Sequence, residues 1–273
     1  MTEPAPTEQP SQFARALAEI AWHAGEIILA HYEAGVEARH KEDRSPVTVA
    51  DEEAEQFILA RLRHEWPDIA VVAEEEAAAG KIQTIGSRFF LVDPLDGTKE
   101  FLKRNGEFTV NIAEIENGVP VRGVVYAPAK NRMFIGDRGG DGKNAAFEID
   151  TTLHELVSFD HVRRIEARPA PEHGLIAVAS RSHRDTRTEE YLAHYPVKDF
   201  LAAGSSLKFC LVAAGEADIY PRHGRTMEWD TAAGHAVLAA AGGSVTQLDG
   251  TPFIYGKTAE SFANPFFVAR GRP

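Results

Sequence analysis

Acidic residues directly follow two apolar segments of this chain. Asp93 and Asp96 lie in LVDPLDGTKEF, residues 91–101, after an apolar run. Glu74–Glu76 follow AVVA in the same way, and Asp230 stands at the expected start of a helix. Strand ends are where open sheets usually build their sites. Taken singly, Glu74–Glu76 could be an exposed turn and Asp230 a helix N-cap, so the spacing of Asp93 and Asp96 decides the interpretation.

Asp93 and Asp96 are close enough to need a positive partner. Two carboxylates ~4 Å apart repel by roughly 4 kcal/mol at an effective dielectric constant of 20. Hard oxygen ligands suit Mg²⁺, whereas zinc would call for histidine or cysteine, and the 11 histidines show no ligand spacing. Leu95 can add a backbone carbonyl ligand. The segment therefore predicts a magnesium site.

Gly97 and Thr98 follow the two acids at the expected start of the helix TKEFLKR. Backbone N–H groups at a helix N-terminus attract anions, and phosphate is a common one. A cation site next to a phosphate cradle is the chemistry of phosphoryl transfer.

The elements that must position these residues alternate along the chain. We expect helices at about 12–32, ended by Gly35, and 49–65, ended by Trp66-Pro67. Strands are predicted at 69–73, 88–93, 108–115 and 119–127, the last two joined as a hairpin by Asn117-Gly118.

The second half of the sequence reads as α/β. We expect a strand at 174–180, a helix capped by 182–185 that runs to about 194, and helices at about 204–215 and 230–242. The predicted organisation is a flexible tail at 1–12, an α+β half with the metal site at 13–145, and an α/β half with nucleotide-binding elements at 146–273. The segment 136–168, with its glycine-rich turn, is the expected boundary region.

Composition excludes several classes of protein. The 273 residues are 44% hydrophobic, enough for a full core, and no apolar run reaches membrane-spanning length. A net charge of −12 argues against a nucleic-acid surface. The single cysteine, Cys210, excludes an internal disulfide and fits a reducing compartment, so we expect a cytoplasmic protein with no integral membrane association.

Two long segments carry a family resemblance. FLVDPLDGTKEF and WDTAAGHAVL resemble the signature segments of the inositol monophosphatase-like superfamily of Mg²⁺-dependent, lithium-sensitive phosphatases. DGTKEFLKRNGEFTVNIA, SRSH and GSSLKFCLVA are more similar to its 3′(2′),5′-bisphosphate nucleotidase branch. The resemblance runs from about residue 14 to 267. It implies a layered αβαβα sandwich of the inositol monophosphatase and fructose-1,6-bisphosphatase type, with α+β and α/β parts.

The resemblance also implies roles for individual residues. The first metal would be held by Glu74, Asp93 and the Leu95 carbonyl. The second would be held by Asp93, Asp96 and Asp230, with a third ion bound weakly near Glu74. Glu74, together with the first metal, would lower the pKa of a bound water. Thr98, supported by Asp51, would orient this water for direct attack on phosphorus. Gly97, Thr98 and Asp230 would also contact the substrate.

Asp51 has a second, purely structural interpretation. Thr48-Val49-Ala50-Asp51 is a capping box for the helix that starts at residue 49. Asp51 could cap this helix, support Thr98, or do both.

The implied substrate is adenosine 3′,5′-bisphosphate, losing its 3′-phosphate to give AMP, with its sulfated relative as a second candidate. Ser205, Ser206 and Lys208 could bind the 5′-phosphate, although Lys208 could also be a solvated helix lysine. Weaker candidates for substrate contacts are Arg181, His183, Arg222 and Arg225.

Two other functions stay open. An inositol- or sugar-phosphate phosphatase would share the metals, and a non-catalytic phosphonucleotide sensor would keep the pocket alone. Such a sensor is expected to lack at least one metal acid, yet all four are present. The chain is therefore predicted to be a Mg²⁺-dependent enzyme acting on a small nucleotide, as a monomer or homodimer.

Overall fold

The computed structural model describes residues 8–40, 46–138, 144–152, 157–160, 162–179 and 186–273. The helices are α1 (Gln12–Ala34), α2 (Val49–Glu65), α3 (Glu74–Ala78), α4 (Thr98–Leu102), α5 (Thr186–Leu192), α6 (Leu207–Ala213) and α7 (Glu228–Ala240), with 3₁₀ turns η1 (Pro128–Lys130) and η2 (Thr258–Glu260). Within these ranges, every helix is too short or too polar to cross a bilayer.

A seven-stranded sheet forms the centre of the first half. Its order is β3 (Ala70–Ala73), β4 (Arg88–Asp96), β5 (Thr109–Glu116), β6 (Val119–Ala127), β7 (Arg132–Arg138), β8 (Asn144–Asp150) and β9 (Arg163–Ile165). β3 and β4 are parallel, and all other neighbours are antiparallel. A short pair, β1 (Arg39–His40) and β2 (Pro46–Val47), stands apart from it.

The predicted hairpin between β5 and β6 is confirmed. Asn117 and Gly118 have φ values of 52° and 78°, the left-handed conformations that a two-residue hairpin turn requires. The helix predicted at 49–65 has the same bounds in the structure. The predicted strands 69–73 and 88–93 correspond to β3 and β4.

The second half is built on a five-stranded sheet. Its order is β11 (Val197–Ala202), β10 (Leu175–Ala179), β12 (Ile219–Arg222), β14 (Phe267–Arg270) and β13 (Ser244–Gln247). Of these strands, sequence reasoning predicted β10 alone. The capping box predicted for α5 lies outside the described residues.

The predicted boundary between residues 145 and 146 falls inside β8. This strand pairs with β7 on one side and with β9 on the other, so the first sheet continues to Ile165. We propose that the first half ends after Ile165, which still lies in the expected boundary region 136–168.

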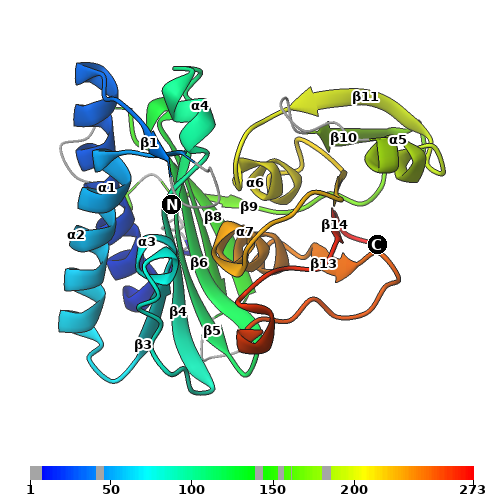
Figure 1. Cartoon of the computed structure of the whole chain (residues 1–273). Coiled ribbons are helices and arrows are strands. Elements are labelled where there is room, and N and C mark those ends of the chain that lie inside the picture. The colour runs from blue at the N-terminus through cyan, green and yellow to red at the C-terminus, as the bar shows by residue number, and fades with distance from the viewer. Residues whose placement is uncertain (1–7, 41–45, 139–143, 153–156, 161, 180–185) are drawn as a thin grey trace, which may run out of the picture.

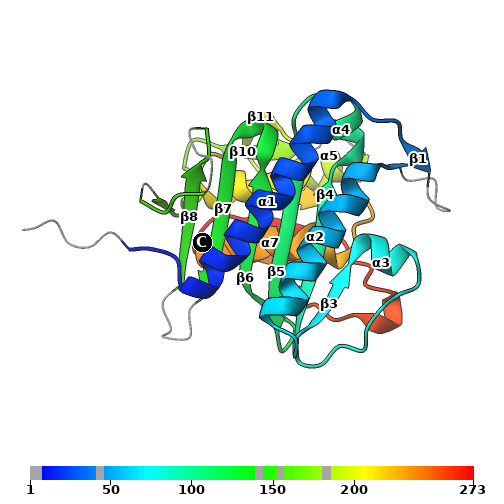
Figure 2. The same cartoon turned by 90° about the vertical axis from the view of Figure 1, so that its left-hand side faces the viewer.

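The elements stack in five alternating layers (Figures 1 and 2). α1 and α2 cover one face of the seven-stranded sheet, α6 and α7 lie between the two sheets, and α5 covers the far face of the five-stranded sheet. Apolar side chains fill each space between layers, in three separate clusters. The expected αβαβα sandwich is confirmed.

Glycines allow α7 to lie unusually close to the large sheet. A Cβ on Gly123 would come within 2.6 Å of the Ala233 carbonyl oxygen, and one on Gly136 within 2.5 Å of the Ala236 carbonyl oxygen. Real Cβ atoms do not approach other atoms so closely, so β6 and β7 must carry glycine here. This close approach sets the height at which the N-terminus of α7 meets the ends of β3 and β4.

Candidate metal and phosphate site

Asp93 and Asp96 share one face of the large sheet because β4 contains a bulge. Asp93 pairs with Asn111 of β5, and Asp96 pairs with Thr109. The two partners are two residues apart on β5, whereas the two acids are three residues apart on β4. Side chains alternate between faces, and residues three apart would otherwise point to opposite sides. The extra residue between the two acids restores the alternation. Both carboxylates therefore face the layer of α6 and α7.

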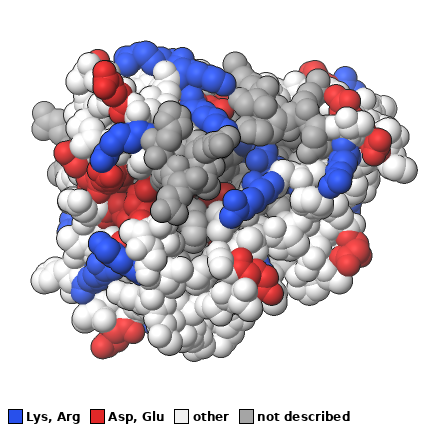
Figure 3. Space-filling view, in the orientation of Figure 1, with Lys and Arg blue, Asp and Glu red and all other residues white. Residues whose placement is uncertain are grey.

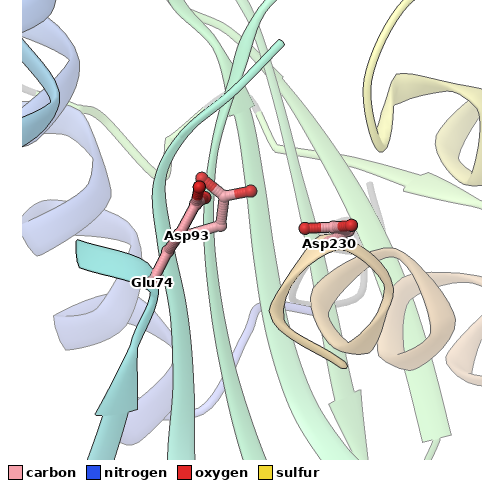
Figure 4. Close-up of side chains that lie close together, drawn as sticks. All are labelled: Glu74, Asp93 and Asp230. Carbon is pink, nitrogen blue, oxygen red and sulfur yellow. The ribbon is translucent and has the colours of Figure 1, made fainter. Parts of the chain in front are cut away.

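Three acids from different elements converge at this point. Glu74 at the start of α3, Asp93 of β4 and Asp230 of α7 each place a carboxylate oxygen within 4.8 Å of the others. In Figure 4, Glu74 and Asp93 point toward one another while Asp230 faces them from α7. Figure 3 shows acidic side chains gathered on the left of this face, with basic side chains around them. The structure thus brings together three of the predicted metal ligands.

Asp96 lies beside these three carboxylates, and Ser205 and Ser206 from the second half of the chain hold it there. Its Oδ2 accepts a hydrogen bond from the Ser206 backbone N–H at 2.6 Å, and its carbonyl oxygen accepts one from Ser205 Oγ at 2.8 Å. The Leu95 carbonyl oxygen, the other predicted ligand, lies 3.4 Å from Thr98 Oγ1. Asp96 is thus not among the three carboxylates that lie within 4.8 Å of one another.

The two serine hydroxyls bind the protein itself. Ser206 is 1% exposed, and its Oγ lies 2.8 Å from Thr109 Oγ1 and 2.6 Å from Asn111 Oδ1. Ser205 Oγ also donates to the Glu107 carbonyl oxygen at 2.8 Å. We predicted both serines as substrate contacts, and this stays a prediction: Ser205 lines the pocket described below, whereas Ser206 does not. Both serines also support Asp96.

Asp51 makes both of its expected contacts. Its Oδ2 accepts the Thr48 N–H at 2.8 Å and the Thr48 hydroxyl at 2.7 Å, which completes the capping box of α2. Its Oδ1 accepts a hydrogen bond from Thr98 Oγ1 at 3.2 Å. The structural and the functional interpretation are thus compatible.

The segment after Asp96 requires glycine. Gly97 has φ 93°, and a Cβ there would come within 2.2 Å of Ser205 Oγ. It places Thr98 at the start of α4, which ends at Leu102, earlier than the predicted end near residue 104.

A pocket next to the acids contains two cationic side chains. Asp96, Asp230, Lys208 and Arg222 all line it. Lys208 is 4% exposed, and its Nζ donates to the Ser205 carbonyl oxygen at 2.6 Å. Burial therefore excludes the interpretation of Lys208 as a solvated surface lysine. Arg222 Nε is buried without a hydrogen-bond partner among the described residues, so a ligand in the pocket could supply one.

Burial shifts the pKa values of these groups. It raises the pKa of Asp96 to about 6, against the lowering effect of Lys208 and the Ser206 N–H. Burial, followed by the charges of Asp96 and Glu74, raises the pKa of Asp230 well above its usual range. It also lowers the pKa of Lys208 to about 8. Closely grouped carboxylates with raised pKa values need a cation to ionise fully, and their oxygen donors fit Mg²⁺.

The structure places the weaker candidates for substrate contacts in different environments. Arg222 lines the pocket, whereas Arg225 is exposed and does not line it. Arg181 and His183 lie outside the described residues. Sequence reasoning missed the buried Asn111. It also interpreted Glu55, with Glu52 and Glu53, as solvated surface, which is wrong for Glu55 because this side chain is buried. The position of Glu55 one helical turn after Asp51 was the available signal.

Comparisons with known proteins cover almost the whole chain. The profile of the inositol monophosphatase family matches residues 9–269. The 3′(2′),5′-bisphosphate nucleotidase CysQ of Shigella flexneri is 46% identical over 251 residues, covering 91% of this chain and 96% of that protein. CysQ from Escherichia coli K12 is 45% identical with the same coverage.

Solved structures agree in fold. CysQ from Bacteroides thetaiotaomicron, described as a bacterial member of the inositol monophosphatase family, matches with a TM-score of 0.78 and 40% identity, over 96% of this chain and 97% of that one. The inositol monophosphatase (IMPase) TM1415 of Thermotoga maritima matches with a TM-score of 0.75 at 24% identity, over 95% of this chain and 92% of that one. With its layered fold and its converging carboxylates, this chain belongs to the inositol monophosphatase family.

Proposed function

We propose that this protein is a Mg²⁺-dependent 3′(2′),5′-bisphosphate nucleotidase. It removes the 3′-phosphate of adenosine 3′,5′-bisphosphate to give AMP and phosphate, and its 5′-phosphosulfate relative is a second candidate substrate. The CysQ relatives, which are 45–46% identical, are 3′(2′),5′-bisphosphate nucleotidases, and this similarity supports the assignment. The observation that carries it is the pocket in which a carboxylate group borders two buried or half-buried cations.

The carboxylates would hold two or three Mg²⁺ ions. Glu74, Asp93 and the Leu95 carbonyl suit one ion, and Asp93, Asp96 and Asp230 suit a second. When bound, such ions activate a water and neutralise charge on the phosphoryl oxygens. Because their pKa values are raised, any protons on Asp96 and Asp230 would have to leave when the ions bind.

Thr98 would orient the attacking water. Its hydroxyl hydrogen is directed to Asp51 Oδ1, which leaves the Thr98 oxygen to accept a hydrogen bond from water. Asp51 is itself fixed by the capping box of α2. Gly97 and Thr98 would place their N–H groups toward the scissile phosphate.

Lys208 and Arg222 would bind the second phosphate of the substrate. Both line the pocket, and a guanidinium and an ammonium form strong charge-assisted hydrogen bonds with phosphate. The carbonyl of Ser205 holds the Lys208 ammonium in place. A substrate with a second phosphate at the 5′ position would bind these cations, whereas inositol 1-phosphate has no second phosphate to offer them.

The same observations weigh against the sensor hypothesis. A phosphonucleotide sensor has no need for Glu74, Asp93 and Asp230 within ligand distance of one another, together with the contact between Asp51 and Thr98. We place the enzyme in the cytoplasm, in keeping with its one cysteine, and the substrate is a small nucleotide bound by a monomer or homodimer.

The deciding experiment compares two substrates. Purified protein with Mg²⁺ is assayed for phosphate release from adenosine 3′,5′-bisphosphate and from inositol 1-phosphate, with a chelator control. We expect kcat/KM to be far higher for the nucleotide and activity to vanish with the chelator. A higher value for inositol 1-phosphate would select the inositol-phosphatase function, and binding without turnover would select the sensor.

A further inference from the structure

The helix that carries Glu74 begins without a cap of its own. Its N-cap residue is Ala73, whose side chain makes no capping hydrogen bond. The first turn contains Glu74, Glu75 and Glu76. The first N–H groups of a helix have no partners within it and need acceptors from elsewhere. A metal ligand at such a position is held only as firmly as the start of its helix.

Glu55 of α2 supplies the missing acceptors. Its Oε2 accepts the Glu75 N–H at 2.7 Å, and its Oε1 accepts the Glu76 N–H at 2.8 Å. Both oxygens of one carboxylate are thus used on two successive backbone groups. Glu55 is 4% exposed, and burial raises its pKa to about 7, against the effect of these two N–H groups. The two N–H groups are directed at its two oxygens even though burial disfavours the charged form.

Glu55 and Asp51 lie one turn apart on the same face of α2. Residues four apart on a helix are neighbours, so the helix presents both side chains to the places where α3 and α4 begin. Asp51 contacts the Thr98 hydroxyl, and Glu55 contacts the backbone that directly follows Glu74. One rigid turn of α2 therefore links the residue that would orient water to the residue that would bind metal.

We propose that Glu55 is a positioning residue, which fixes the start of α3 and with it the Glu74 carboxylate relative to Asp93 and Thr98. This inference rests on the proposed function of the carboxylate group as a metal site. Arg63 of α2 also pairs with the Glu76 carboxylate, at 3.2 and 2.6 Å, but this pair is partly exposed and holds a side chain only. Glu55 alone, among the described contacts from α2, holds the backbone next to Glu74.

The test uses Glu55→Gln, with Glu53→Gln as the matched control. The amide keeps the shape of the side chain, but only its oxygen can accept a hydrogen bond. Its NH₂ group is a donor and cannot accept from the second backbone N–H group. Glu53 lies on the same helix and pairs with His31 at 2.7 Å on the surface, away from α3. Mn²⁺ binding to metal-free protein, measured by electron paramagnetic resonance without substrate, reports on the site independently of turnover.

We expect Glu55→Gln to weaken Mn²⁺ binding by roughly 10- to 100-fold, the range typical of residues that orient metal ligands. At saturating metal, kcat should fall while the KM for the nucleotide changes little. Glu53→Gln should bind Mn²⁺ as the wild type does. Wild-type Mn²⁺ affinity in folded Glu55→Gln, with only a lower melting temperature, would reduce Glu55 to a helix cap and overturn the proposal.

Glu55→Asp keeps the charge but shortens the reach. It should bind Mn²⁺ with an affinity between those of the wild type and Glu55→Gln. If Glu55→Gln does not fold, this variant carries the test, and wild-type affinity in it overturns the proposal. If the wild-type protein binds Mn²⁺ but does not hydrolyse adenosine 3′,5′-bisphosphate, the nucleotidase assignment fails while the role of Glu55 is still measured by the binding data.

Discussion

At the scale of single residues, Asp51 divides its two oxygens between two tasks. One oxygen closes the capping box of α2 and the other accepts from Thr98. We expect Asp51→Asn to lower kcat by roughly 10²-fold, because the Thr98 hydroxyl loses the charged acceptor that orients it. The measurement is steady-state phosphate release, with the melting temperature recorded in parallel.

Thr48→Val serves as the control for Asp51. It removes the cap hydroxyl but leaves the contact between Asp51 and Thr98, so it should cost about 1 kcal/mol of stability and leave kcat nearly unchanged. If Asp51→Asn also affects stability alone, Asp51 is a helix cap without a catalytic role.

Lys208 permits a test of substrate choice. Because it is buried, Lys208→Met keeps most of its packing while removing its charge. Loss of a charge-assisted contact of about 1.5 to 3 kcal/mol should reduce kcat/KM for adenosine 3′,5′-bisphosphate by roughly 10- to 200-fold. Hydrolysis of inositol 1-phosphate, which has no second phosphate, should change little.

The exposed lysine of α4 provides the matching control, since Lys99→Met removes a charge that does not line the pocket. It should leave both substrates unaffected. Equal losses on both substrates in Lys208→Met would indicate a general defect of the pocket. They would contradict the assignment of Lys208 to the 5′-phosphate.

At the scale of elements, the contact between α7 and the large sheet positions Asp230. Gly136→Ala would bring a Cβ within 2.5 Å of the Ala236 carbonyl oxygen, so α7 must shift. Overpacking of this kind typically costs about 1–3 kcal/mol. We expect a lower melting temperature and weaker Mg²⁺ activation. Gly86→Ala, where a Cβ meets nothing within 4 Å, should change neither.

The sequence correctly predicted the helices, strands and turns that have strong local signals. The capping box at Thr48, the Asn117-Gly118 turn and the apolar runs before Glu74 and Asp93 each specify structure through neighbouring residues. Four strands of the second half, β11 to β14, and three of the first, β7 to β9, were not predicted. They are three to seven residues long and owe their pairing to distant partners. The local sequence of such short segments does not distinguish them from loops.

The arrangement of the site was predicted only in part, for the same reason. The acids at 93 and 96 are evident in the sequence, but their common face depends on a bulge that exists only in register with β5. The burial of Lys208 and the internal bonds of Ser206 depend on how α6 packs against the large sheet. These features depend on contacts between segments that are distant in the sequence, so the spacing of neighbouring residues cannot predict them.

At the scale of the whole molecule, the site links stability to metal and pH. Asp96 and Asp230 have pKa values raised above those of the unfolded chain, so the folded protein keeps protons that the unfolded chain loses. Their contribution to stability is therefore greatest below about pH 4 and falls as pH rises through about 6 for Asp96. Mg²⁺ bound at the proposed site would replace these protons and should reverse the loss.

We expect the rise in melting temperature on adding Mg²⁺ to be small near pH 5 and to grow as the pH passes through about 6. Comparing samples with Mg²⁺ and with chelator at each pH removes contributions from groups far from the site, such as His235, whose pKa burial lowers to about 3. Asp96→Asn should flatten the trend. A Mg²⁺ effect that does not depend on pH would contradict the raised pKa values.

The order of the ligands along the chain has a consequence for biosynthesis. Glu74 and Asp93 follow neighbouring parallel strands, but Asp230 arrives with α7, after most of the polypeptide has left the ribosome. Contacts between such distant segments close late in folding. A nascent or truncated chain that stops before α7 lacks the third carboxylate and the helix that packs on Gly123 and Gly136. We therefore expect fragments that stop before α7 to lack both the metal affinity and the hydrolytic activity of the full-length protein.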